Sequence, residues 1–126
     1  MGKFSIKSTK TVFTYSLIAR NGQVIAVGGE VYNTLASIKK GIESVSKNAP
    51  VAKIEDQTIE GYVKQTNPKF EIYKDKSGEF RFRLKAKNGE IIAVSEGYVR
   101  KYSCKKGIES VRINAVDSPV MEPEEK

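Results

Sequence analysis

One short segment of the 126-residue chain alternates cations with apolar residues. The cations occupy every second position: Arg81, Arg83, Lys85 and Lys87. Successive side chains of a β-strand point to opposite faces, so this spacing predicts a row of cations on one face, about 6.6 Å apart. Tyr73, from a neighbouring predicted strand, places an aromatic ring beside the row. Such a face is suited to neutralising phosphates and stacking unpaired bases, and it predicts a site for single-stranded nucleic acid or an acidic protein.

The same residues also fit an ordinary solvent-facing strand. Glu71 is expected opposite Arg83, and Glu90 opposite Lys87 across an Asn-Gly turn, because charged residues commonly pair across neighbouring strands. A solvent face must carry polar groups, and lysines near a sheet edge discourage aggregation. An anion site and a merely solvated face therefore remain alternatives.

Catalytic and metal-binding side chains are scarce. The chain has no His and one Cys, which removes the commonest general base and metal ligand and any disulfide or cysteine-based zinc site. Cys104 falls on the apolar face of a predicted helix, where a small buried hydrophobe is expected. We predict a protein that is not an enzyme, with no catalytic residue, no metal site and no cofactor.

A second candidate surface is apolar. Ile18, Ile25 and Val27 are expected on the outer face of the sheet. An uncovered apolar patch marks an interaction site for a partner or a second copy of the chain. The alternative is that a swapped strand or a terminus covers these residues.

Overall composition adds two expectations. The net charge of +7 favours anionic partners, although small proteins also carry such a charge for solubility. The chain begins without the apolar stretch of a secretory signal, and no run approaches the roughly 20 apolar residues of a membrane span. We expect a cytoplasmic protein with no membrane partner, either a monomer or a weak homodimer.

The chain is an internal duplication. Residues 13–27 and 80–94 share 8 identities in 15 positions, and residues 32–49 and 98–115 share 11 in 18. Any fold for one copy must therefore suit the other. A lone unit of about 60 residues buries too little surface to be stable, so a single interlocked domain is expected.

Each copy opens with two strands whose apolar residues alternate with polar ones. The predicted inner face comprises Phe4, Ile6, Phe13, Tyr15, Leu17, Ala19, Phe70, Ile72, Phe80, Phe82, Leu84 and Ala86. An Asn-Gly pair follows in each copy, at 21–22 and 88–89, and predicts a hairpin with a type I′ turn. The third strands, 24–27 and 91–94, are apolar on both faces and are expected at the centre of the sheet, with Ile92 and Val94 beside the cations.

Each copy then contains a helix. Its predicted N-caps are Ser37 and Ser103. Gly41 and Gly107 lie inside the helices and are expected to allow close approach to the sheet. Segment 52–58 predicts a fourth strand in the first copy. Its counterpart at 116–123 contains two prolines and is expected to be a short edge strand or a tail.

The second copy contains Ser-Glu-Gly-Tyr at 95–98, Ser-Cys-Lys-Lys-Gly-Ile-Glu-Ser-Val at 103–111 and Asn-Ala at 114–115. With the Asn-Gly hairpin before them, these motifs resemble the YegP-like family of small bacterial tandem-repeat proteins, over nearly the whole chain. The first copy departs from the pattern, with Gly-Gly-Glu-Val-Tyr at 28–32. The resemblance implies β-β-β-α-β units that join in one antiparallel sheet and exchange their last strands. It implies no activity, because the function of that family is not established.

The predicted fold is α+β: two tandem β-β-β-α-β repeats form one antiparallel sheet with two helices on one face and swapped terminal strands. Repeat 1 is expected at 1–58, a linker at 59–68, repeat 2 at 69–121 and an acidic tail at 122–126. The predicted function is a non-enzymatic binding or accessory module for an anionic partner, acting through the basic sheet face. The alternative is a structural or protein-interaction domain that acts through the apolar face or by homodimerisation.

Overall fold

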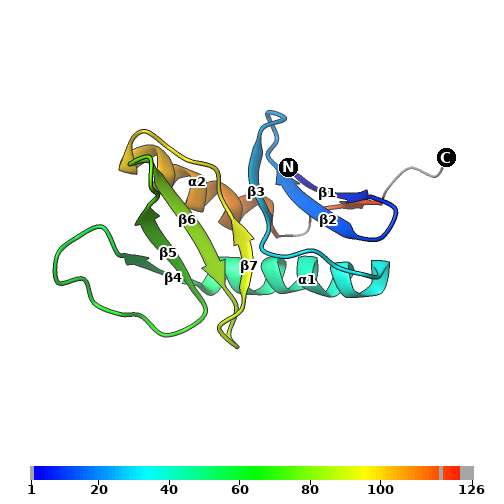
Figure 1. Ribbon diagram of the computed structural model, residues 1–126, viewed down its shortest axis with the longest axis horizontal. Helices are drawn as coiled ribbons and strands as arrows, with labels where there is room; N and C mark the ends of the chain where they lie inside the picture. Colours follow the sequence, from blue (N-terminus) through cyan, green and yellow to red (C-terminus); the bar gives the residue numbers. More distant parts are fainter. Residues whose placement is uncertain (1, 117, 123–126) are drawn as a thin grey trace.

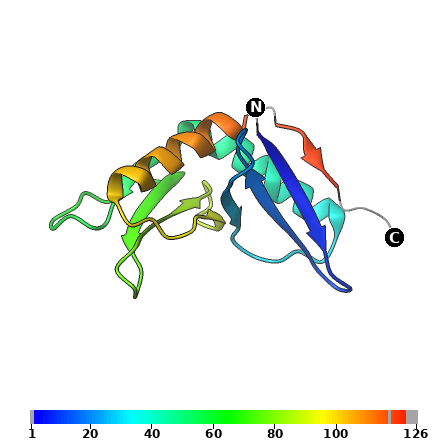
Figure 2. The same ribbon diagram turned by 90° about the horizontal axis from the view of Figure 1, so that it is seen from above.

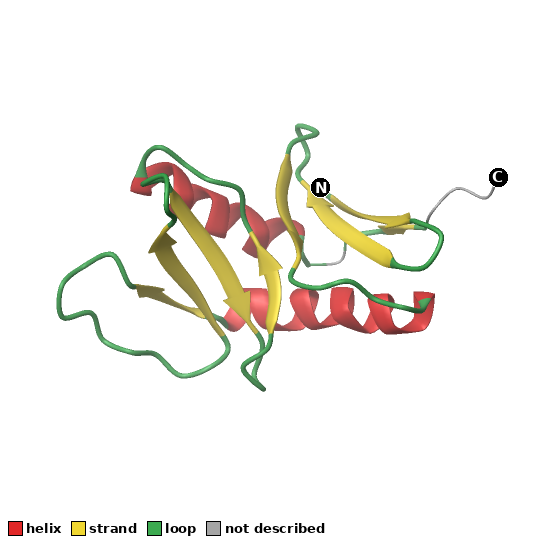
Figure 3. Ribbon diagram, in the orientation of Figure 1, coloured by secondary structure: helices red, strands yellow, loops and turns green. Residues whose placement is uncertain are grey.

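The computed structural model describes residues 2–116 and 118–122. One eight-stranded sheet carries two helices on one face, as Figure 1 and the coloured view in Figure 3 show. Figure 2 shows both helices on the same side of the strands. The elements are β1 (Lys3–Ser8), β2 (Phe13–Ile18), β3 (Val24–Gly28), α1 (Leu35–Asn48), a 3-10 turn (Ala49–Val51), β4 (Lys53–Asp56), β5 (Lys69–Lys74), β6 (Phe80–Lys85), β7 (Ile91–Val94), α2 (Lys101–Asn114) and β8 (Val120–Met121).

The sheet order β4-β5-β6-β7-β3-β2-β1-β8 shows how the repeats interlock. The third strands meet at the centre, where Val27 pairs with its repeat-equivalent Val94. The fourth strand of each repeat crosses to the other repeat: β4 joins β5, and β8 joins β1. This confirms the predicted α+β fold and the strand exchange. Both exchanged strands run parallel to their neighbours, so the sheet is mixed and not wholly antiparallel.

The hydrophobic core lies between the sheet and the helices. The predicted alternation is confirmed, since the inner-face residues of both hairpins are buried or packed against the core. In the hairpin of β5 and β6, Ile72 lies opposite Phe82 and Phe70 opposite Leu84, so the apolar residues of both strands share the inner face. Among the described residues, neither helix is long and apolar enough to cross a membrane.

Both helices begin earlier than predicted. The N-caps are Thr34 and Arg100, whose backbones are extended with φ of −134° and −116°. The Thr34 hydroxyl accepts a hydrogen bond from the Ser37 N–H at 3.0 Å, and the Ser37 hydroxyl accepts one from the Thr34 N–H at 3.4 Å. Ser37 therefore completes a capping box from inside the helix. The prediction of Ser37 and Ser103 as N-caps was wrong.

The Asn-Gly hairpins close with three-residue loops, not type I′ turns. In repeat 2 the Ala86 N–H donates to the Glu90 carbonyl and the Gly89 N–H donates to the Ala86 carbonyl, both at 2.9 Å. Gly89 has a φ of 86°, the left-handed conformation that ends this type of loop. Lys87 consequently lies in the loop, beyond the end of β6. The same loop type closes the hairpin of repeat 1, where Gly22 has a φ of 87°.

A β-bulge in repeat 1 changes which face the next residues occupy. Leu17 pairs with Ala26. The following residue, Ile18, pairs with Val24, so that Ile25 has no partner in the ladder. An extra residue shifts the alternation of faces by one position. Ile25 is therefore in the core, 8% exposed, and its predicted place on the outer face was wrong.

The helix glycines accommodate tyrosines. A Cβ at Gly41 would overlap the hydroxyl of Tyr32, and one at Gly107 would lie 2.5 Å from the hydroxyl of Tyr98. Each helix glycine therefore allows a close approach, as predicted. The group that approaches it is the tyrosine ring that follows the third strand of the same repeat, rather than the sheet itself. The shared glycine and tyrosine are thus one packing unit that appears twice.

The C-terminal segment was expected to be either a short edge strand or a tail, and it forms the short edge strand. Phe4 and Ser5 of β1 pair with Val120 and Met121 of β8. Glu122, the first residue of the expected acidic tail, forms an ion pair with Lys39 at 2.6 Å. The remainder of that expected tail, 123–126, lies outside the described residues.

Candidate anion-binding face

Three of the four predicted cations lie together on the outer face of the sheet, opposite the helices. Arg81, Arg83 and Lys85 belong to β6, where they alternate with buried residues. The fourth, Lys87, is exposed in the loop and is not part of the strand row. Val94 does pair with Arg83 as expected. Ile92 does not face the cations: a bulge after Leu84 leaves it in the core, 5% exposed.

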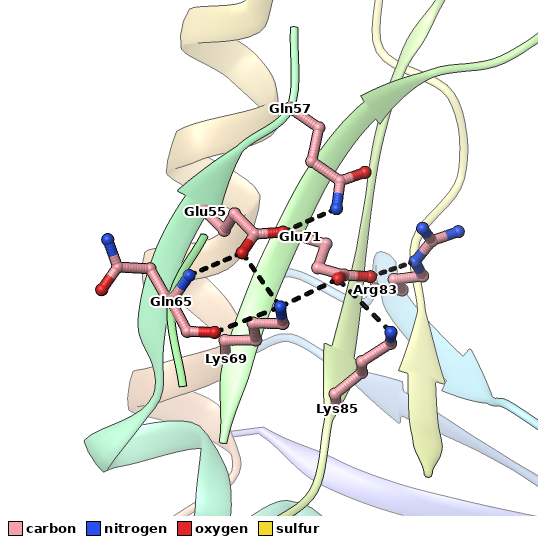
Figure 4. A network of polar contacts seen from close by, with 7 residues as sticks. All are labelled: Glu55, Gln57, Gln65, Lys69, Glu71, Arg83 and Lys85. Carbon is pink, nitrogen blue, oxygen red and sulfur yellow. Dashed lines mark hydrogen bonds and ion pairs between the residues drawn. The ribbon is translucent and has the colours of Figure 1, made fainter. Parts of the chain in front are cut away.

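A buried ionic network lies beside these cations on β4 and β5, and Figure 4 shows it. Its centre is Lys69, whose Nζ lies 2.9 Å from Glu55 Oε1 and 3.3 Å from Glu71 Oε2. The three side chains are only 4%, 1% and 3% exposed, respectively. Glu71 in turn pairs with Arg83 at 2.6 Å and with Lys85 at 3.4 Å. Because three cations face two carboxylates, the network keeps one net positive charge.

The linker between β4 and β5 supplies further hydrogen bonds to the network. The backbone N–H of Gln65 donates to Glu55 Oε1 at 2.7 Å, and the Gln65 carbonyl accepts from Lys69 Nζ at 3.3 Å. Gln57, just after β4, donates through its side-chain amide to the other oxygen of Glu55 at 2.6 Å. Buried charges persist only where such partners satisfy them, and here the polar linker is part of that arrangement.

The environment keeps the network ionised. Burial opposes the charge on Glu55, but hydrogen bonds from Gln57, Lys69 and the Gln65 backbone outweigh it and hold the pKa at about 2. Burial also opposes the charge on Glu71, and Arg83 outweighs it, so the pKa of Glu71 is lowered. On Lys69 the two carboxylates outweigh burial and raise the pKa.

The two arginines are each held by a carboxylate. Arg83 donates through Nε to Glu71 at 2.6 Å, and its guanidinium carbon lies 4.5 Å from the centre of the Tyr73 ring. Arg81 donates through Nε to Asp75 at 2.7 Å and through Nη1 to the Ser95 carbonyl at 3.2 Å. Figure 4 shows the terminal nitrogens of Arg83 directed away from Glu71. The structure thus brings together Arg81, Arg83, Lys85 and Tyr73.

The predicted pairing of Glu71 with Arg83 is confirmed, whereas Glu55 and Lys69 were not predicted for this site. Lys69 shares the alternation of Glu71 and Tyr73, and that signal places it on the outer face. Glu55 has no comparable signal, because its position depends on the exchanged strand β4 lying parallel to β5.

The predicted apolar patch is smaller than expected. Ile18 and Val27 are half-buried, and Ile25 belongs to the core. Cys104 is fully buried as predicted, and burial, with Asp56 nearby, raises the pKa of its thiol to about 11. A protonated, inaccessible thiol is a poor nucleophile.

A family model described as a domain of unknown function, DUF1508, matches residues 9–56 and 75–122. The first segment spans β2 to β4 and the second spans β6 to β8, so the same part of the duplicated unit is matched twice. The chain belongs to the DUF1508 family. A UPF0339 protein of Photorhabdus laumondii is 38% identical over 111 residues, which cover 87% of this chain and 83% of that protein. A UPF0339 protein of Treponema denticola is 68% identical over 54 residues, which cover 43% of this chain and 93% of that protein.

Two solved structures share the fold of this DUF1508 protein. The solution NMR structure of yegP from E. coli, a protein of unknown function, is 33% identical with a TM-score of 0.75, covering 96% of this chain and 91% of that chain. The solution NMR structure of a UPF0339 protein from Shewanella oneidensis is 26% identical with a TM-score of 0.77, covering 96% and 90%. The YegP-like resemblance is therefore confirmed. The family is one of unknown function, and its descriptions indicate no catalytic activity.

Proposed function

We propose that this protein is a non-enzymatic binding module that holds a phosphate-bearing partner, such as single-stranded nucleic acid, on the outer face of β5 and β6. The observation that carries this proposal is the anchoring of Arg81 and Arg83 through Nε. Each carboxylate partner fixes its arginine through Nε; Arg81 Nη1 also donates to the Ser95 carbonyl, and the outward-facing terminal nitrogens, Arg81 Nη2 and those of Arg83, are placed to bind another acceptor. The two residues lie two positions apart on one strand, about 6.6 Å along it. Successive phosphates or a phosphate and a base can occupy such a pair.

Anchoring favours binding because less side-chain freedom is lost when the ligand arrives. Tyr73, stacked on Arg83, extends the guanidinium into a flat surface on which a base can stack. The neighbouring network retains one positive charge, so the carboxylates orient the cations without cancelling them.

The test is the affinity of a fluorescently labelled oligothymidylate, measured by anisotropy at several salt concentrations. Binding should weaken steeply as salt rises, because counterions are released from the phosphates. The double variant Arg81→Gln/Arg83→Gln should bind at least about tenfold more weakly. Lys10→Gln/Arg20→Gln removes the same charge from exposed positions of repeat 1 and serves as the matched control. Thermal unfolding of all variants establishes that they remain folded.

Three results decide the matter. A selective loss in the variant of repeat 2 supports the site. An equal loss in both variants shows that only overall charge matters, and absence of salt-sensitive binding by the native protein rejects nucleic acid as the partner. Arg81→Lys/Arg83→Lys sharpens a positive result, since it keeps the charge but removes the guanidinium geometry.

A second role, association with another protein surface, is favoured by a different observation. Helix α2 exposes apolar side chains along a groove. That groove lies on the helix side of the molecule, on the opposite face from Arg81, Arg83 and Lys85.

A further inference from the structure

The exposed face of α2 forms one side of an apolar groove of about 570 Å³. Tyr102 and Ile113 are 68% and 75% exposed, and both line the same groove, where apolar side chains gathered in one patch mark an interaction site. Ile54, from the edge strand β4, forms the opposite side. The lining residues are Ile54, Tyr102, Lys105, Lys106, Glu109, Ser110, Ile113 and Asn114.

Comparison with repeat 1 shows that the fold does not require these apolar residues. Ala36 stands at the α1 position equivalent to Tyr102, and Lys47 at the position equivalent to Ile113. Helix α1 nevertheless has the same length and packs on the same sheet. The exposed apolar pair of α2 is therefore an addition to the repeat, and burial against a partner accounts for it.

The arrangement along α2 is self-complementary. Tyr102, Lys106, Glu109 and Ile113 are spaced by four, three and four positions, so they share one face of the helix. Rotation by 180° about the middle of that face exchanges Tyr102 with Ile113 and Lys106 with Glu109. A second, antiparallel copy of the helix would thus oppose apolar to apolar and cation to anion. Isologous dimers have this property, since the same patch serves both subunits.

We propose that α2 docks against α2 of a second copy of this chain, in an antiparallel pair with twofold symmetry. Tyr102 of each copy contacts Ile113 of the other, and Lys106 of each pairs with Glu109 of the other. Glu109 already pairs with Arg112 at 2.6 Å. The Glu109 side chain is exposed, however, and an exposed ion pair is weak enough for Glu109 to change its partner. Lys106 lies 5.2 Å from the Tyr102 ring, at the centre of the contact.

The size of the contact predicts a weak dimer. A helix of 14 residues is about 21 Å long, and one helix pair falls short of the roughly 1,200 Å² that stable interfaces bury. Association is therefore expected only near the top of the accessible concentration range, with a dissociation constant of about 0.1–1 mM. Sedimentation and NMR diffusion measurements up to about 1 mM cover that range.

The decisive experiment reverses the two charges separately. Lys106→Glu opposes Glu109 of the partner with another anion, and Glu109→Lys opposes Lys106 with another cation, so each variant alone should be monomeric. A mixture of the two variants restores both ion pairs and should form the heterodimer. The matched controls are Lys40→Glu and Glu43→Lys, the equivalent substitutions on α1, which should leave dimerisation unchanged. Circular dichroism checks that every variant is folded.

A second variant removes the apolar contacts by copying repeat 1 into repeat 2. Tyr102→Ala/Ile113→Lys should remain folded, because α1 carries those residues, and should be monomeric. A native protein that stays monomeric at about 1 mM overturns the proposal. So does a dimer that survives Lys106→Glu, or a mixture of the charge variants that fails to associate.

Discussion

Thr14 and Ser16 of repeat 1 occupy the strand positions that Arg81 and Arg83 occupy in repeat 2. The strands pair in the same way in both repeats, so the fold accepts small neutral residues where repeat 2 has guanidinium groups. The third cation position differs as well, with Ile18 in place of Lys85. Structural need alone therefore does not explain the cations of repeat 2, and that difference makes them candidates for binding.

The buried network likewise lies at only one end of the sheet, on β4, β5 and β6. At the other end, Ser5 of β1 stands at the position of Glu71, and Met121 of β8 at the position of Glu55. Lys3, the equivalent of Lys69, is exposed. A parallel exchanged strand thus needs no ionic partners to pair. The network instead holds the linker and Arg83 in place, which connects the loop after β4 to the candidate binding face.

The largest expected effect comes from removing the cation at the centre of the network. Lys69→Met leaves Glu55 and Glu71 buried with their charges less compensated, and should lower the free energy of unfolding by about 3–5 kcal/mol. Lys3→Met, at the exposed equivalent position, should change it by less than about 0.5 kcal/mol. Denaturant unfolding of both variants measures the difference. Similar values for the two would show that the buried network contributes nothing particular to stability.

Titration of the same network predicts the response to acid. The pKa of Glu55 is about 2 in the folded protein against the ordinary value of 4.5 for a glutamate side chain, so the folded state prefers the ionised form. Its contribution is present above pH 4.5 and is lost as the pH falls towards 2. Unfolding free energy measured against pH should decline across that window, and Glu55→Gln should make the decline shallower. An unchanged slope in Glu55→Gln would assign acid sensitivity to other carboxylates.

The helix glycines test what the two repeats share. Alanine normally stabilises a helix relative to glycine by about 1 kcal/mol. Here Gly41→Ala and Gly107→Ala would push against the hydroxyls of Tyr32 and Tyr98, so each should destabilise by about 1–3 kcal/mol. The loss should be greater at Gly107, where a Cβ also lies 3.1 Å from Phe82. Thermal unfolding measures both.

A double variant checks the cause of that loss. Tyr32→Phe removes the hydroxyl nearest to the added methyl group and should recover part of the stability of Gly41→Ala. If Gly41→Ala alone is stabilising, the ring moves aside without cost and the packing unit is looser than the geometry indicates.

The alternation of apolar and polar residues was sufficient to predict the faces of the hairpin strands, because residues such as Phe82 and Leu84 are flanked by charged neighbours. It failed for Ile25, since every residue from Val24 to Val27 is apolar and no polar partner reveals the bulge. The Glu55–Lys69 pair could not be predicted from the sequence, for a different reason. Its members are brought together by an exchanged strand whose parallel register no local pattern specifies. The duplicated motif thus predicted the folding unit, and the family resemblance predicted the exchange of last strands, whereas the parallel register of the exchanged strand was seen only in the structure.

The smallest expected effect concerns the aromatic ring on the binding face. Tyr73 contributes a cation–π contact to Arg83 at 4.5 Å, and such contacts at partly exposed sites are worth about 0.5–1 kcal/mol. Tyr73→Leu should therefore lower stability only slightly, while reducing oligothymidylate affinity by about three- to tenfold if the ring also stacks a base. Tyr62→Leu, at an exposed position of the linker, is the control. Loss of affinity with little loss of stability would assign Tyr73 to ligand binding; the reverse would make it a structural support for Arg83.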